Sequence, residues 1–295
     1  MRAQPSEYEL VAPGKLTAVL DLLAREPGVW LPIAGGTEVM VQYGAGRLGA
    51  RKLVSLWGLP ELRRIEQNAQ ELFIGAGCTY ADLRSHPQIE REFPLLGRAA
   101  SWTGSIANQN RGTLGGNIVN ASPAADSLPA LLVYEAELLL VSARGERRIP
   151  YAGFHTGYKQ TVLSADEIIA AIVLQPRFTG YHAYSRKVGT RNAQAIAKLC
   201  LAGLGKVSDK KIEDVRLAIG SMAVTPLRLR RTEASLLGRT WSPTIVREAR
   251  KALEAEVAPI DDIRSTAAYR LHVAGNLLQE FVESLFARNS AGREQ

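Results

Sequence analysis

The chain has 295 residues, 46% hydrophobic and 22% charged, an ordinary globular composition with length for one large domain or two to three smaller ones. The net charge is +7, but basic and acidic residues are interspersed, so an acidic protein partner is favoured over nucleic acid. Two cysteines, Cys78 and Cys200, cannot build a disulfide framework or supply the four ligands of an iron–sulfur cluster.

No apolar run approaches the ~18 residues of a membrane span, and the N-terminus lacks the apolar stretch of a signal peptide. We therefore expect a cytoplasmic protein. The four histidines are dispersed and show no metal-ligand spacing, so no metal site and no catalytic residue is predicted.

Residues 1–56 read as a small α/β unit. Apolar residues at helical spacing predict a helix from Leu16 to Leu23, followed by strands at 31–34 and 52–56. The first strand runs into Gly35-Gly36. Thr37 is a plausible N-cap for a helix over 39–42, whose first free amides would favour an anion.

The next stretch, to Pro176, alternates strands and helices. Strands are predicted at 71–77, 137–141, 147–149 and 167–174. Helices are predicted from Thr79, which would act as N-cap, and over 94–102.

Between these elements, residues 111–126 combine glycine, short hydroxyl side chains, Asn and Asp with little bulk. Gly115 and Gly116 lack a Cβ, so their backbone amides could approach a phosphate or diphosphate. Asp126 could hold a ligand hydroxyl. The alternative is a tight turn of small residues between strands, with Asp126 capping a helix that begins near Ser127.

Two Gly-Gly turns, each after an apolar run, suggest one diphosphate held from two sides. Neither turn matches the G-x-G-x-x-G dinucleotide fingerprint or the phosphate loop that ends in Gly-Lys-Ser/Thr. A nucleotide site here must therefore be of another type.

Residues 177–295 have a different pattern. Strands are predicted at 183–187 and 215–219, followed by helices at 227–237, 243–255 and 265–286. The last helix carries an apolar stripe that favours core packing over partner binding. Residues 288–295 are polar and are predicted to form a disordered tail. The stripe comprises Leu271, Ala274, Leu278, Phe281, Val282 and Leu285.

Taken together, the motifs resemble the FAD-binding medium subunit of molybdenum hydroxylases, a family that includes the flavin subunits of xanthine dehydrogenase and aerobic carbon monoxide dehydrogenase. The motifs occur in family order and span nearly the whole chain. One departure is 106–109, where the family commonly has Pro-Gln-Ile-Arg. The matching segments are 34–37, 110–117, 121–127, 186–189, 195–197 and 259–266.

The resemblance implies an α+β fold: a two-subdomain FAD-binding fold of the vanillyl-alcohol-oxidase/PCMH type, then a C-terminal domain of antiparallel strands and a helix bundle. The FAD-binding domain would span 1–176, with subdomains 1–56 and 57–176. The C-terminal domain would span 177–295.

The resemblance also implies an FAD site. The flavin would be non-covalent, because Thr37 stands where a covalent flavin histidine would be needed. Asp126 would accept a hydrogen bond from a ribityl or ribose hydroxyl, Ile169 would lie against the flavin ring, and Lys187 would place positive charge near the ring's carbonyls. The predicted cofactor-binding residues are Ile33, Ala34, Gly35, Gly36, Thr37, Glu38, Thr113, Leu114, Gly115, Gly116, Asn117, Ala121, Asp126, Ile169 and Lys187.

By the same resemblance, the chain would be an oxidoreductase subunit. It would take electrons from [2Fe-2S] clusters of a small subunit and pass them to NAD or another acceptor. A large subunit would hold the molybdenum cofactor, in a dimer of heterotrimers. Two alternatives remain: a self-sufficient FAD-dependent oxidase or reductase of the same superfamily, and a nucleotide-binding scaffold without redox activity.

Overall fold

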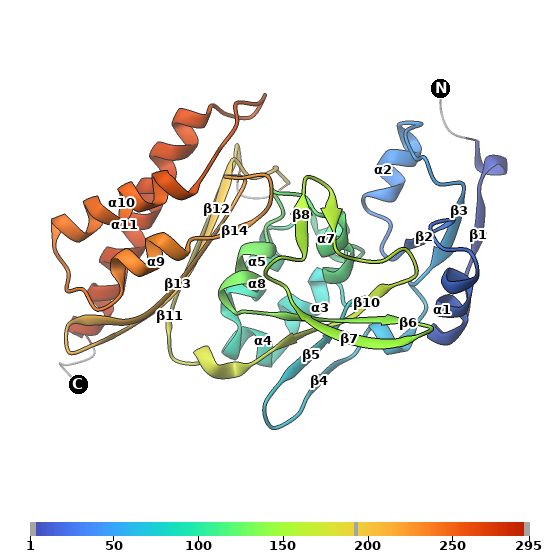
Figure 1. The fold of residues 1–295 in the computed structure, drawn as a ribbon, viewed down its shortest axis with the longest axis horizontal. Helices are drawn as coiled ribbons and strands as arrows, with labels where there is room; N and C mark the ends of the chain where they lie inside the picture. The colour runs from blue at the N-terminus through green and yellow to red at the C-terminus, as the bar shows by residue number, and fades with distance from the viewer. Residues whose placement is uncertain (1–3, 192–193, 292–295) are drawn as a thin grey trace. The chain divides into compact units, whose positions relative to one another are not determined.

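The computed structural model of the chain describes residues 4–191 and 194–291, with side chains described as far as residue 287. It divides into two compact units that interleave along the sequence (Figure 1). None of the helices in these ranges has the length and apolar content that crossing a lipid bilayer requires. Unit 1 takes in the described residues of Met1–His86, Gly104–Ala121 and Glu135–Pro176, and unit 2 those of Pro87–Thr103, Ser122–Tyr134 and Arg177–Gln295.

Unit 1 contains a small parallel sheet. Its strands, in order, are β1 (Glu9–Val11), β3 (Lys52–Ser55) and β2 (Trp30–Ile33). Helix α1 (Leu16–Arg25) buries the side chains of Val19, Leu20 and Leu23 in the core of this sheet. The predicted amphipathic helix and both predicted strands of 1–56 are therefore confirmed.

A five-stranded antiparallel sheet forms the rest of the unit 1 framework. It supplies a rigid support because its central strand, β10 (Ile168–Leu174), is apolar and almost entirely buried. The strand order is β4 (Ile65–Gln67), β5 (Leu72–Gly75), β10, β6 (Glu137–Ser142) and β7 (Gly145–Pro150).

Short elements of unit 1 surround these sheets, and several differ from the predictions. Thr79 caps its helix through a reciprocal capping box with Asp82, as predicted. Thr37 is not an N-cap: it lies in a turn, and Glu38 holds the cap position without a side-chain bond. Strands β1 and β4, two helices and a hairpin were not predicted. The two helices are α6 (Ile106–Gln109) and α7 (Leu114–Asn120), and the hairpin consists of β8 (His155–Gly157) and β9 (Gln160–Thr161). The remaining elements are η1 (Pro5–Glu7), α2 (Val39–Gly44), η2 (Pro60–Leu62) and α3 (Tyr80–Ser85).

Unit 2 is built on an antiparallel sheet. Its strands, in order, are β11 (His182–Val188), β12 (Leu199–Ser208), β13 (Lys211–Gly220) and β14 (Leu227–Arg228). The helices are α4 (Pro87–Glu92), α5 (Pro94–Trp102), α8 (Leu128–Val133), α9 (Arg230–Leu236), α10 (Pro243–Glu256) and α11 (Ala267–Ala291), with the turn η3 (Pro176–Phe178) before β11.

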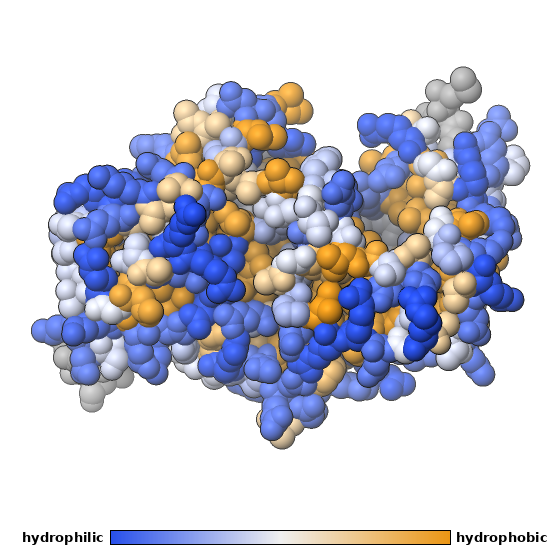
Figure 2. All heavy atoms as spheres, in the orientation of Figure 1, coloured by the Kyte–Doolittle hydropathy of each residue, from blue (hydrophilic) through white to orange (hydrophobic). Residues whose placement is uncertain are grey.

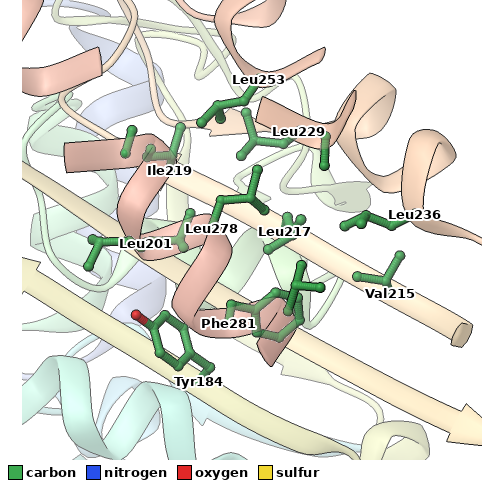
Figure 3. Packing of buried hydrophobic residues seen from close by; sticks show 14 of the residues in the cluster. Tyr184, Leu201, Val215, Leu217, Ile219, Leu229, Leu236, Leu253, Leu278 and Phe281 are labelled. Carbon is green, nitrogen blue, oxygen red and sulfur yellow. The ribbon is translucent and has the colours of Figure 1, made fainter. Parts of the chain in front are cut away.

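The side chains of β12 alternate between the two faces of this sheet. Leu199 and Leu201 point into a core shared with α9, α10 and α11, where Leu278 and Phe281 of α11 lie against the strands (Figure 3). Cys200 is on the other face, on the side of α8. The outer side of α9–α11 is mostly hydrophilic in the view of Figure 2. The apolar stripe of α11 therefore packs into the core, as predicted.

Most predicted helices of unit 2 are present, but several elements differ from the prediction. Strand β12 and helix α4 were missed. The helix predicted at 227–237 begins only at Arg230, because Leu227 and Arg228 pair with β13. The predicted disordered tail is wrong for residues 288–291, which continue α11, and its last part, 292–295, lies outside the described residues.

Candidate functional site

The first glycine loop, residues 34–38, leaves the end of β2 with its amides unused. Within the described part of the chain, none of the five amides from Ala34 to Glu38 donates a hydrogen bond. Gly36 has φ +75°, a left-handed conformation that glycine adopts without strain. Consecutive unpaired N–H groups in a turn form a concavity that suits an anion.

The second glycine loop, residues 111–117, lies directly against the first. A Cβ atom on Gly35 would be 1.6 Å from the carbonyl oxygen of Arg111 and 3.2 Å from the amide nitrogen of Gly112. The two backbones can approach this closely only because Gly35 has no side chain. The predicted proximity of the two glycine segments is therefore confirmed.

The amides of Leu114, Gly115 and Gly116 in the second loop, however, are already used. Leu114 donates to the carbonyl of Cys78 (3.0 Å), Gly115 to the carbonyl of Ala76 (2.9 Å), and Gly116 to Oγ1 of Thr113 (3.1 Å). Thr113 is the N-cap of α7. These amides anchor α7 in unit 1, so the expectation that they face a ligand is corrected.

Gly115 and Gly116 of this loop have different surroundings. Gly115 is buried, and a Cβ there would lie 2.5 Å from the Cβ of Ala76, so its missing side chain serves helix packing. Gly116 is exposed, and only Oγ1 of Thr113 would lie near an added Cβ. Gly116, on the first turn of α7, is thus the glycine of this loop that a ligand can approach.

Arg111 adds positive charge beside the two loops. Its guanidinium lies over the ring of Trp57, 3.8 Å from the centroid, and Arg63 lies near the same ring at 4.9 Å. Such cation–π stacking restricts the guanidinium without removing its charge. Arg111 was not among the predicted site residues, although its position beside Gly112 was a signal.

Two further predicted residues of unit 1 are buried. Ile169 is 3% exposed and pairs with Leu140 beside an irregularity in β10, which agrees with a core side chain. Ala121 is 3% exposed and ends α7 in a left-handed conformation with φ +47°.

In unit 2, Asp126 and Lys187 form a buried ion pair. The ammonium of Lys187 donates to Oδ2 of Asp126 (2.6 Å) and to the carbonyl of Trp102 (3.0 Å). The two side chains are 8% and 4% exposed. Asp126 therefore does not act as a helix cap, and the charged end of Lys187 is buried with it.

The Asp126 carboxyl has an unusual environment. Burial raises its pKa to about 6, although Lys187 acts in the opposite direction. Within the described residues, its second oxygen, Oδ1, is buried without a hydrogen-bond partner. A buried hydrogen-bond acceptor without a donor costs folding free energy, so such an atom points to a donor supplied by a ligand.

Neither cysteine has the environment of a reactive thiol, and no cluster of metal ligands exists in the described ranges. Burial raises the pKa of Cys78 to about 12 and the pKa of Cys200 further. Both cysteines pack as small apolar side chains.

Two family profiles cover most of the chain. The one described as "FAD binding domain in molybdopterin dehydrogenase" matches residues 6–176, and the one described as "CO dehydrogenase flavoprotein C-terminal domain" matches residues 184–285.

Individual relatives match from end to end. The chain is 30% identical over 274 residues to the xanthine dehydrogenase FAD-binding subunit of Escherichia coli, covering 92% of this chain and 94% of that protein. It is 28% identical to the carbon monoxide dehydrogenase medium chain of Hydrogenophaga pseudoflava, covering 96% and 99%.

A solved structure of the Hydrogenophaga pseudoflava carbon monoxide dehydrogenase, lacking the Mo-pyranopterin moiety of its molybdenum cofactor, aligns with a TM-score of 0.91 and 27% identity. The alignment covers 97% of this chain and 99% of the matched chain. The chain therefore belongs to the FAD-binding medium subunits of the molybdenum hydroxylases, the oxidoreductase family of xanthine and carbon monoxide dehydrogenases.

Proposed function

We propose that this chain is the electron-transfer subunit of a three-component molybdenum hydroxylase. It takes electrons from iron–sulfur clusters of a small partner subunit and passes them to NAD or another acceptor, and a large partner subunit holds the molybdenum cofactor. The observation that carries the proposal is the end-to-end match to xanthine dehydrogenase FAD-binding subunits and carbon monoxide dehydrogenase medium chains.

The residues of unit 1 fit the diphosphate of FAD. Five unpaired amides of the first glycine loop offer donors to phosphate oxygens, and the exposed Gly116 leaves the neighbouring surface open. We assign diphosphate and adenosine contacts to Ile33–Glu38 and to Gly116 and Asn117, the two residues of 113–117 that are not buried. The other predicted residues of 113–121 would support these contacts from the core: Thr113, Leu114, Gly115 and Ala121. Ile169, which is buried, would pack beneath the surface on which the flavin ring lies.

The residues of unit 2 fit a polar group of the cofactor. Oδ1 of Asp126 lacks a donor and would accept from a ribityl or ribose hydroxyl. Lys187 has two acceptors in the chain, so one of its three N–H groups is left for a carbonyl of the flavin ring. Its charge, buried in a low dielectric, would favour electron density on that ring.

When bound, FAD supplies the exchange between one-electron and two-electron carriers, while the protein sets its position and electrostatics. We assign FAD binding mainly to a domain of residues 1–176, followed by a C-terminal domain at 177–295. One family profile ends at residue 176 and the next begins at residue 184, which supports this division.

Purification of the tagged chain from its own host tests the proposal. We expect two co-purifying chains, one equivalent of FAD per tagged chain, and molybdenum and iron in the same particles. We expect the molecular mass of the purified particle to correspond to a dimer of such heterotrimers. If NADH reduces the iron–sulfur clusters of the purified complex, NAD is identified as the electron acceptor. Isolation of the chain alone as a fully active oxidase would instead support the self-sufficient alternative.

A further inference from the structure

The tip of the β8–β9 hairpin carries a lysine that reaches two other segments of unit 1. Nζ of Lys159 donates to Oδ1 of Asn120 (2.5 Å) and lies 3.9 Å from Oε1 of Glu38. Lys159 itself has φ +57°, which is uncommon for a residue with a side chain. The hairpin backbone thus adopts a disfavoured conformation at the residue that makes these contacts.

The two partners of Lys159 belong to the two glycine segments. Glu38 is the last residue of the first glycine loop, whose amides are unpaired. Asn120 is the last residue of α7, which begins in the second glycine loop. Gly35 and Arg111 already bring these segments together at one point, and Lys159 joins them at a second.

The base of the hairpin is fixed to the same helix. Nε2 of His155 lies 2.8 Å from the carbonyl oxygen of Ile118, so this nitrogen carries the proton and donates. Burial lowers the pKa of His155, which favours the neutral form of the ring. With His155 and Lys159 both bonded to α7, the hairpin holds Lys159 at a fixed place beside the first glycine loop.

We propose that Lys159 is a positioning residue for FAD, one that holds the first glycine loop against α7 and neutralises Glu38 beside the unpaired amides. This inference rests on the proposed FAD site. Without Lys159, the first glycine loop, which has few hydrogen bonds of its own, would have to become ordered when the ligand binds. The entropy lost in this ordering weakens binding. An uncompensated carboxylate next to the amides would also repel a diphosphate.

Titration of the full apo-chain with FAD tests the proposal. Lys159→Met keeps the length of the side chain and removes its charge and donors, so we expect the dissociation constant of FAD to rise about five- to tenfold. Lys159→Arg, which restores the charge, should return it to within about twofold of wild type. Lys206→Met is the matched control, because Lys206 makes an exposed ion pair with Glu213 in unit 2.

A positioning role differs from a purely structural one in two readouts. The thermal unfolding midpoint of the apo-chain should stay the same in Lys159→Met, because the lost contacts are partly exposed. Asn120→Ala should add little to the loss of affinity in Lys159→Met if both act through one contact. Full additivity would contradict the proposal.

The outcomes also separate this inference from the proposed function. Unchanged FAD affinity in Lys159→Met, with a wild-type chain that binds FAD, would overturn the positioning role and leave the FAD site standing. A wild-type chain that binds no FAD would overturn both.

Discussion

Gly35 and Gly115 show that glycine can serve contact between backbones as well as contact with a ligand. An added Cβ would meet the backbone of Arg111 at Gly35 and that of Ala76 at Gly115. The amides beside them differ in the same way: those of 34–38 are unpaired, and those of 114–116 are bonded within the chain. The anion-binding capacity therefore lies mainly in the first glycine loop.

Replacement of Gly35 tests this contact. In Gly35→Ala the new methyl group would overlap the Arg111 carbonyl, so the two loops must separate at a cost of about 1–3 kcal/mol. We expect loss of FAD after gel filtration and a lower unfolding midpoint. Gly44→Ala in α2 has nothing within 4 Å of the added Cβ and should keep both properties. An unaffected Gly35→Ala chain would show that the loops do not pack as described.

The Asp126–Lys187 pair has a pH signature that follows from its burial. The pKa of the Asp126 carboxyl rises from 3.8 to about 6 on folding, so between these values the folded chain holds a proton that the unfolded chain has lost. The contribution of this group to stability is thus highest at low pH, and it falls as pH rises from about 4 to about 6.

Asp126→Asn removes this titration. We expect the free energy of unfolding of wild type, relative to that of Asp126→Asn, to decrease from pH 4 to pH 6, as measured by urea unfolding of the apo-chains at both pH values. The other carboxyl groups titrate in both proteins and cancel in the difference. A difference that is constant, or that grows with pH, would contradict the raised pKa.

Strand β12 and helix α11 illustrate how an element can depend on a partner far along the chain. Gly203 and Gly205 lie on the face of β12 that receives α11: added Cβ atoms would come within 2.9 Å of Phe281 and 2.6 Å of Leu285. The two glycines form a groove that these side chains fill, and Phe281 is fully buried there.

Gly203→Val should therefore destabilise the chain by about 1–3 kcal/mol through overpacking against Phe281. The second change Phe281→Leu, which removes bulk from the opposing side, should recover part of this loss. Chemical denaturation of the single and double variants measures the coupling. Strictly additive losses would mean that the two side chains do not meet.

The same groove explains why β12 escaped sequence analysis. Glycine is depleted in strands, so a segment with Gly203 and Gly205 lacks the apolar and β-branched pattern by which β10 was predicted. Helix α7 was missed for a similar reason, since Gly115 and Gly116 have low helix propensity and the Thr113 cap outweighs it.

The residues of the candidate site also differ in whether their roles depend on local sequence or on distant contacts. Glycine motifs and Asp126 could be selected from the sequence because their chemistry is local and the motifs resemble a known family. Lys159 gains its role from a tertiary contact with Asn120, for which no periodicity or short motif gives a signal. Arg111 stands in a matching segment beside Gly112, but its stacking on Trp57 is a tertiary contact that the motif does not reveal. The use of the 114–116 amides by Ala76, Cys78 and Thr113 was hidden for the same reason.

At the scale of the whole molecule, the two units interleave along the chain. Residues 87–103 and 122–134 belong with the C-terminal part, and the second glycine loop lies between them in the sequence but in unit 1. Asp126 follows that loop by only a few residues and yet bonds to Lys187 in unit 2. The motif segment 111–126 thus contributes to both units, which a division into consecutive domains does not convey.

We propose that this chain holds one FAD without a covalent bond, through the first glycine loop. The most direct test is titration of the purified full-length apo-chain with FAD, followed by acid precipitation. We predict saturation at one FAD per chain, with all of the flavin released into the supernatant. A chain that takes up no FAD would contradict FAD binding, and flavin that stays with the precipitated protein would contradict non-covalent attachment.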